Sequence, residues 1–144
     1  MIDNPMQDIP LAAVLRSPVV GMSDKELAGM MAAYRSQADK GQDRGIYAAA
    51  MCWEGLKGFF ERLERFRLLA SYLPIHELIY RLYEETGYYD YVSAMPAGAT
   101  RRANLDMLME KAVAYEQTSY HGLFHFIRYI DRLMKYDVDY GEAE

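Results

Sequence analysis

Apolar residues recur at spacings of three and four along most of the chain, which is the pattern of helices that bury one face. The longest such segment covers 53–73, and its stripe comprises Trp53, Leu56, Phe60, Leu63, Phe66 or Arg67, Ala70 and Leu73. We expect this helix to form the spine of the core, with Trp53 and Cys52 inside it. No segment alternates between apolar and polar residues in the way a half-buried strand does. The pattern therefore predicts an all-α, multi-helix fold.

Breaker residues divide the rest of the chain into further helices. The expected helical segments are about 8–17, 23–35, 46–52, 75–86, 88–95, 100–117 and 120–136. The last of them is expected to bury Leu123, Phe124, Ile127, Ile130 and Met134. Residues 37–45 are polar and glycine-bounded and predict a surface loop. We treat 1–144 as a single helical domain whose acidic tail, 137–144, frays.

The opening stretch, NPMQDIPLAAVLRSPVVGMSDKEL, contains capping and helix-breaking residues that predict a helix, a tight turn and a second helix. Asp8 is expected to cap the first helix, which must end before Pro18. Gly21 then permits backbone angles that a side chain would disfavour. Ser23 and Glu26 have the spacing of a capping box, which marks the start of a helix.

Composition limits the function classes. The 144 residues, 51% hydrophobic and 26% charged, are typical of a globular chain. A net charge of −5 lacks the basic signature of a free-standing nucleic-acid binder, so any DNA contact must be local. A single cysteine excludes an internal disulfide and fits a reducing cytoplasm. No apolar run approaches the roughly 18 residues of a membrane span.

Few residues suggest chemistry. His121 and His125 share a helix face, but Gly122 stands where a zinc protease has glutamate, so we expect ordinary surface or packing histidines. Cys52 lies between apolar neighbours and suggests core rather than nucleophile. The 13 tyrosines can stack on bases, although at helical spacing tyrosine more often fills a core. The chain has neither a phosphate-binding glycine loop nor an acidic nuclease cluster, so by itself it is expected to catalyse nothing and to bind no cofactor.

Several short sequence motifs of the chain resemble those of a known family. Asn4-Pro5, Asp8 and the pattern Pro18-x-x-Gly21-Met22-Ser23-x-x-x-Leu27 are similar to the start of the 2B subdomain in UvrD/PcrA-type superfamily 1 DNA helicases. The stretches EETGYYDYV, RANL and YEQTSYHGLFHFIRYI fit the same family. The opening wording is closer still to the AddA-type (RexA-like) helicase–nuclease subunits of bacterial AddAB complexes, which are relatives of RecB.

The resemblance implies a 2B-like helical insertion in an ATP-dependent helicase/nuclease that unwinds and processes double-strand DNA ends for recombinational repair. ATP and Mg²⁺ are implied for the parent protein, through domains outside this chain. The implied partners are double-stranded DNA, the motor domains of the same parent and an AddB-like partner subunit, with no membrane. The implied role of the segment is to guide duplex DNA or to pack on the motor domains and the partner subunit.

In the resembled helicases the turn that contains Gly21 lies close to the duplex, and a helix N-terminus suits a phosphate group. Here Val19 and Val20 occupy positions that are usually basic, and Ser23 replaces a second glycine. The candidate DNA-contacting residues are Arg16, Ser17, Gly21, Ser23 and Lys25, with Arg101 and Arg102 as a second basic site. The alternative is a purely structural helix–turn–helix junction.

Two other function classes remain open. One is the 2B-like domain of a UvrD-type helicase that has no nuclease. The other is a stand-alone helical interaction module without a motor.

Overall fold

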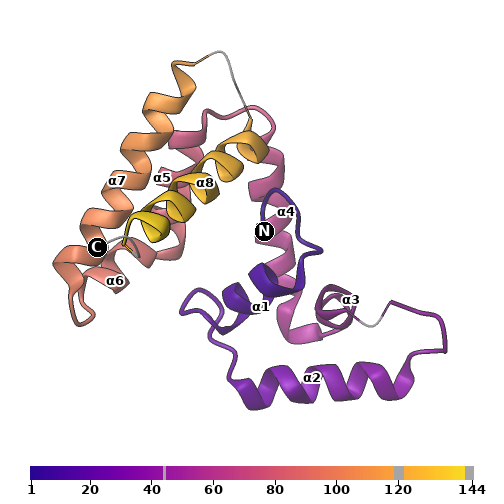
Figure 1. The fold of residues 1–144 in the computed structure, drawn as a ribbon. Helices are drawn as coiled ribbons and strands as arrows, with labels where there is room; N and C mark the ends of the chain where they lie inside the picture. The colour runs from indigo at the N-terminus through magenta and orange to yellow at the C-terminus, as the bar shows by residue number, and fades with distance from the viewer. Residues whose placement is uncertain (44, 119–121, 142–144) are drawn as a thin grey trace.

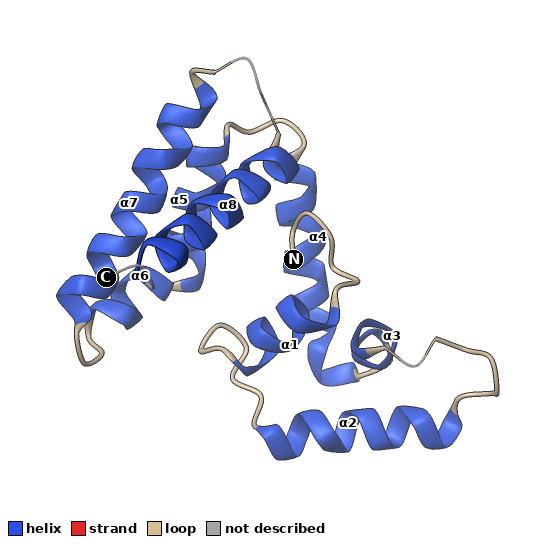
Figure 2. Cartoon of the chain, in the orientation of Figure 1, coloured by secondary structure: helices blue, strands red, loops and turns tan. Residues whose placement is uncertain are grey.

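A computed structural model describes residues 1–43, 45–118 and 122–141, with side chains as far as 136. Within these residues the chain is helical and contains no strand, which confirms the all-α prediction (Figure 2). The elements are α1 (Asp8–Arg16), α2 (Asp24–Gln37), α3 (Ile46–Met51), a 3₁₀ turn η1 (Glu54–Leu56), α4 (Lys57–Ala70), α5 (Ile75–Thr86), α6 (Tyr88–Ser93), α7 (Gly98–Glu116) and α8 (Leu123–Gly141).

The helices form two halves that share α4 (Figure 1). α1, α2 and α3 gather around the start of α4, whereas α5 to α8 gather beyond its other end. Phe59 and Leu63 of α4 belong to the apolar core of the N-terminal half. Phe66 and Leu69, one to two turns later, pack with Leu78 of α5. α4 is therefore the spine that the hydrophobic pattern predicts, and it serves two cores.

The predicted start of this helix and the burial of Trp53 are wrong. α3 ends at Met51, Trp53 has extended backbone angles, and α4 begins only at Lys57. Trp53 is 38% exposed, and Cys52 is exposed beside it. The physical reason is the break in the helix between α3 and α4. Residues spaced by three and four lie on one face only while the helix is continuous, so the break separates Trp53 from the apolar stripe of α4.

The last helix also differs from its prediction. α8 runs from Leu123 to Gly141, past the expected end at 136. Phe126 is its buried residue, whereas Phe124 and Met134 are 48% and 62% exposed. Phe124 lies instead beneath the guanidinium of Arg128. α8 packs on α5 and α7 through the face centred on Phe126, and the two other side chains fall outside that face.

Candidate nucleic-acid contact at the turn between α1 and α2

The turn begins where Ser17 ends α1. The Ser17 hydroxyl donates to the Val14 carbonyl oxygen at 2.6 Å, and its oxygen accepts from the Val19 N–H at 3.3 Å. Ser17 itself has extended backbone angles, as expected for a residue before proline. The hydroxyl therefore fixes the chain direction between α1 and the turn.

Asp8 does not cap α1, contrary to prediction. It is the first helical residue, and Gln7 occupies the capping position without a side-chain hydrogen bond. The Asp8 carboxylate accepts from the backbone N–H of Ile46 at 3.1 Å, where α3 begins. α3 has no capping side chain of its own, so the carboxylate of α1 satisfies one of its free N–H groups. This contact ties two helices that are far apart in sequence.

Gly21 has a φ of +79°, so the turn uses the conformational freedom predicted for it. Its N–H donates to the Ser17 carbonyl oxygen at 2.7 Å, and the Met22 N–H donates to the Leu15 carbonyl oxygen at 2.9 Å. The Val20 N–H also donates to Ser17, at 3.1 Å. These three backbone donors are therefore occupied within the turn.

The predicted capping box is present at the start of α2. The Glu26 carboxylate accepts from the Ser23 N–H at 2.7 Å, and the Ser23 hydroxyl oxygen accepts from the Glu26 N–H at 3.1 Å. The hydrogen bonds from the backbone and the hydroxyl of Ser23 hold the pKa of Glu26 below its usual value. A carboxylate at a helix N-terminus also matches the positive end of the helix dipole.

Charges around the turn nearly cancel. Arg16 forms an exposed ion pair with Asp24, with Nε and Oδ1 2.7 Å apart. Lys25 is exposed in the first turn of α2 and is followed by the carboxylate of Glu26. The junction thus presents two basic and two acidic side chains, which limits the attraction it can exert on a phosphate. Its DNA contact stays a prediction.

The structure gathers five of the seven candidate residues and leaves two apart. Arg101 and Arg102 are the fourth and fifth residues of α7, in the C-terminal half, whereas the others surround the α1–α2 turn. Arg101 Nε donates to the Pro96 carbonyl oxygen at 3.2 Å, so part of its guanidinium closes the preceding loop. Arg102 is exposed. These two arginines form a separate basic site.

In the part of the chain that the structure describes, no group of three or more histidine, cysteine, aspartate or glutamate side chains converges. His125 is exposed on α8, while His121 lies outside the described residues.

A third basic surface, on α8, does not appear in the hydrophobic pattern. His125, Arg128, Arg132 and Lys135 follow one another on α8 at spacings of three, four and three, and all four are exposed. Helical period applied to the basic residues, rather than to the apolar ones, would have revealed this stripe.

The described surface is helical and carries local basic patches, and comparison with known proteins shows what the chain is similar to. No family model matches the chain. The chain is 42% identical, over 99% of its length, to ATP-dependent helicase/nuclease A subunits from Bacillus cereus, Bacillus cytotoxicus and Bacillus mycoides. The predicted resemblance to the AddA family is thereby confirmed over nearly the whole chain.

The chain spans 12% of the length of these relatives. None of the helices in the described ranges combines the length and apolar content that crossing a membrane requires.

Proposed function

We propose that this chain is a helical accessory segment, comparable to a 2B subdomain, of an AddA-type ATP-dependent helicase/nuclease that unwinds and processes double-strand DNA ends. The observation that carries the proposal is the 42% identity to helicase/nuclease A subunits across 99% of the chain. ATP and Mg²⁺ would be bound by the motor and nuclease domains of the parent protein. An AddB-like subunit would be its protein partner, in the cytoplasm.

The surface supports a packing role. Met51, Cys52 and Trp53 are consecutive and exposed at the end of α3, next to the shared helix α4. Contiguous apolar groups on a surface mark sites of protein contact more often than isolated ones do. We assign this corner, defined by residues 51–53, to contact with the partner subunit or the motor domains. The α1–α2 turn would then face duplex DNA with Arg16 and Lys25.

A segment exchange tests the proposal. The aligned segment of the Bacillus cereus protein is replaced by this chain, and ATP-driven duplex unwinding and ATP hydrolysis are both measured. The control replaces the same segment by a flexible glycine–serine linker, which cannot form a helical surface. We expect the exchanged helicase/nuclease to unwind duplex DNA and the linker variant to lose unwinding while it still hydrolyses ATP. Equal unwinding by the two proteins would contradict an accessory role.

Variants of the exchanged helicase/nuclease separate the two surfaces. Lys25→Glu should weaken binding to a forked duplex. It should also make the affinity fall less steeply with salt concentration, because phosphate contacts are electrostatic. ATP hydrolysis on single-stranded DNA should stay nearly intact. Arg101→Glu combined with Arg102→Glu is the matched control for charge reversal elsewhere on the segment. If Lys25→Glu leaves duplex affinity unchanged, the α1–α2 turn is only a structural junction.

A further inference from the structure

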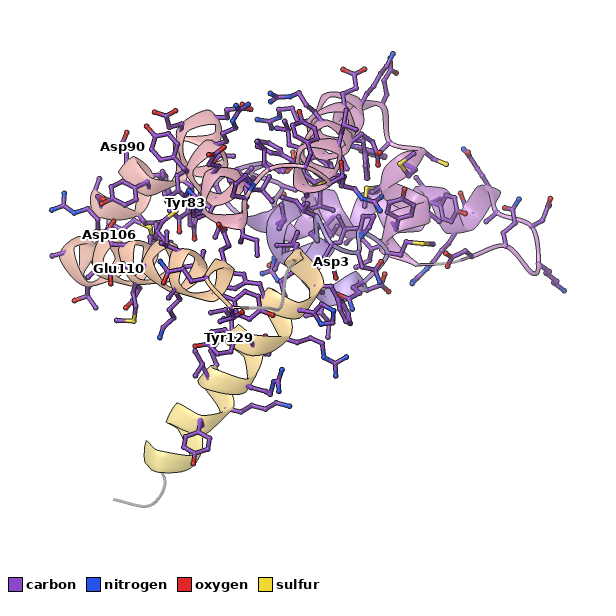
Figure 3. The ribbon with its side chains drawn as sticks, turned by 90° about the horizontal axis from the view of Figure 1, so that it is seen from above. Asp3, Tyr83, Asp90, Asp106, Glu110 and Tyr129 are labelled. Atoms are coloured by element: carbon purple, nitrogen blue, oxygen red, sulfur yellow. The ribbon has the colours of Figure 1, made fainter. Side chains whose placement is uncertain are left out.

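A pocket lined by tyrosines lies where α5, α6 and α7 meet. It has a volume of about 390 Å³, within the range of about 300–1,000 Å³ that small-molecule sites occupy. Its aromatic walls are Tyr80 and Tyr83 of α5 and Tyr89 of α6. The rings of Tyr83 and Tyr89 lie against each other, with centroids 5.8 Å apart and planes inclined by 35°, whereas Tyr80 is 52% exposed. Figure 3 shows Tyr83 on the same side of the molecule as Asp90 and Asp106, which also line the pocket.

Hydrogen bonds hold two of these rings in place. The Tyr80 hydroxyl donates to the Glu84 carboxylate at 2.8 Å, and the Tyr89 hydroxyl donates to the Asp106 carboxylate at 2.9 Å. A carboxylate accepts up to about four hydrogen bonds, so both carboxylates keep acceptor positions for a ligand. The bonds use the hydroxyl groups and leave the faces of the rings for other contacts.

The charged side chains of the lining are all acidic. Glu84, Asp90 and Asp106 supply three carboxylates from three helices, and no lysine or arginine is among the described residues that line the pocket. None of the described residues forms a hydrogen bond or an ion pair with the Asp90 carboxylate. Arg102, one helical turn before Asp106, brings one positive charge near Tyr89. Three carboxylates against one guanidinium leave the pocket with a net negative charge.

We propose that this pocket binds a linear polyamine, an aliphatic chain that carries two or more ammonium groups. The ammonium groups would pair with the carboxylates of Glu84, Asp90 and Asp106, because hydrogen bonds between two charged groups are the strong ones. The face of the Tyr80 ring would attract one ammonium group through its quadrupole. Met109, which also lines the pocket, would cover the methylene groups between the charges.

Two other cations account for less of the site. A metal ion needs several ligand atoms around one point, and in the described part of the chain no three histidine, cysteine, aspartate or glutamate side chains converge in that way. The carboxylates instead come from three helices around aromatic walls, which suits a ligand whose charges are spread along a chain. A lysine side chain of another protein would bring a single ammonium group and leave part of the negative charge unpaired.

The proposal goes beyond the accessory role above. The pocket lies in the C-terminal half, whereas the duplex contact assigned there lies at the α1–α2 turn and the protein contact at residues 51–53. It is testable on the 144-residue chain alone, so its failure leaves the helicase/nuclease proposal standing.

The first test is electrostatic. The chain is titrated with spermidine in a calorimeter at about 150 mM salt, where attraction between charges more than about 8 Å apart is largely screened. We expect one saturable site per chain. Glu84→Gln combined with Asp90→Asn should weaken binding about tenfold or more, because hydrogen bonds to charged groups are lost. The control, Asp39→Asn with Glu54→Gln, removes two exposed carboxylates from the N-terminal half and should leave the affinity unchanged. Equal effects of the two pairs would show that spermidine follows the net charge of the chain and would overturn the proposal.

Competition identifies the kind of cation. N-acetyl-lysine amide carries one ammonium group, and Mg²⁺ carries its charge at one point, so both should displace spermidine only at concentrations far above that of spermidine. Displacement by N-acetyl-lysine amide at the same concentration as spermidine would identify a site for a protein side chain. Displacement by Mg²⁺ at that concentration would identify a metal site. Either result would overturn the proposal.

The last test is aromatic. Tyr80→Leu keeps an apolar side chain but removes the ring, and it should weaken spermidine binding about two- to fivefold. Tyr80→Phe should keep the affinity, because the attraction between a cation and a ring does not need the hydroxyl. Circular dichroism should show unchanged helical content in every variant, since the altered side chains are exposed. Equal affinities of Tyr80→Leu and Tyr80→Phe would overturn the proposal, because the carboxylates alone would then account for binding.

Discussion

The two halves of the molecule are held together by different means. In the N-terminal half, Leu11, Leu15 and Met30 are completely buried and pack with α3 and the start of α4. In the C-terminal half the buried residues fall into two smaller clusters, around Phe126 and around Leu78. The first half thus has one continuous core, and the second has a divided one.

Polar contacts compensate in the C-terminal half. The Glu116 carboxylate of α7 accepts from the His76 N–H at the start of α5 at 2.8 Å and lies 2.9 Å from the ring Nδ1 of the same residue. The Tyr83 hydroxyl donates to the Leu105 carbonyl oxygen at 3.1 Å. Such bonds are each worth about 1 kcal/mol net, less than the burial of a large side chain. The C-terminal half also exposes large apolar side chains, among them Tyr72, Tyr80, Met107 and Phe124, which are available for other contacts.

The largest expected effect is in the continuous core. Leu15→Ala should lower the free energy of unfolding by about 2–5 kcal/mol, because it removes buried methyl groups and leaves a cavity. Ile9→Ala, on the same helix but 85% exposed, should change it by less than about 0.5 kcal/mol. Urea denaturation of both variants checks the prediction, and similar values would mean that the N-terminal half has no special core.

A close backbone approach predicts the next effect, in the C-terminal half. Gly98 begins α7, and a β-carbon there would overlap the carbonyl group of Ser93 at the end of α6. Gly98→Ala should therefore cost about 1–3 kcal/mol of stability. Gly29→Ala within α2 meets no neighbouring atom and should instead stabilise the chain by about 0.5–1 kcal/mol. Thermal unfolding should show shifts of opposite sign, and two shifts of the same sign would contradict the packing of α6 on α7.

The hydrogen bond from the His76 N–H of α5 to the Glu116 carboxylate of α7 predicts a smaller effect. Glu116→Ala removes the side chain that caps α5 and should cost about 1–2 kcal/mol, within the range for lost caps. Glu110→Ala, an exposed position on the same helix, controls for the change in helix propensity and charge. Chemical denaturation that gives equal stabilities for the two variants would show that the bond from α7 to α5 contributes nothing.

The smallest effect concerns alkaline pH. Burial, with a further contribution from the charge of Asp106, raises the pKa of Tyr83 to about 12. The folded state therefore holds this proton more tightly than the unfolded state, whose tyrosine has a pKa of about 10. The resulting stabilisation is complete below pH of about 10 and is lost as the pH rises through about 12. A tyrosinate absorbance titration should show a late phase that disappears in Tyr83→Phe and in denaturant, and its persistence in Tyr83→Phe would assign it elsewhere.

Sequence patterns predicted the fold well where all the residues of a pattern lie close together along the chain. The capping box at Ser23, the φ of Gly21 and the bounds of α5 follow from residues within one turn of each other. Asp8 shows the limit, because its partner at Ile46 is set by how α1 packs on α3. Trp53 shows another, because an apolar stripe cannot reveal a break in the helix that carries it.

The candidate site was predictable only in part. Arg16 and Lys25 could be grouped because they flank one turn, but the ion pair from Arg16 to Asp24 depends on how α2 leaves that turn. The stacking of Tyr115 on Tyr129 could not be predicted from the sequence, because the two rings come together only when α7 and α8 cross.

Hydrogen exchange tests the contrast between the halves most directly. It is measured by mass spectrometry on the isolated chain and on the Bacillus cereus helicase/nuclease whose aligned segment has been replaced by this chain. In the isolated chain the amides of α1 and the start of α4 should exchange slowest and those of α8 fastest, since protection follows burial. Within that larger protein, the amides of α8 should exchange more slowly than in the isolated chain, while the exchange of the α1 amides stays unchanged. Protection of α8 equal to that of α1 in the isolated chain, with no gain in the larger protein, would contradict this account.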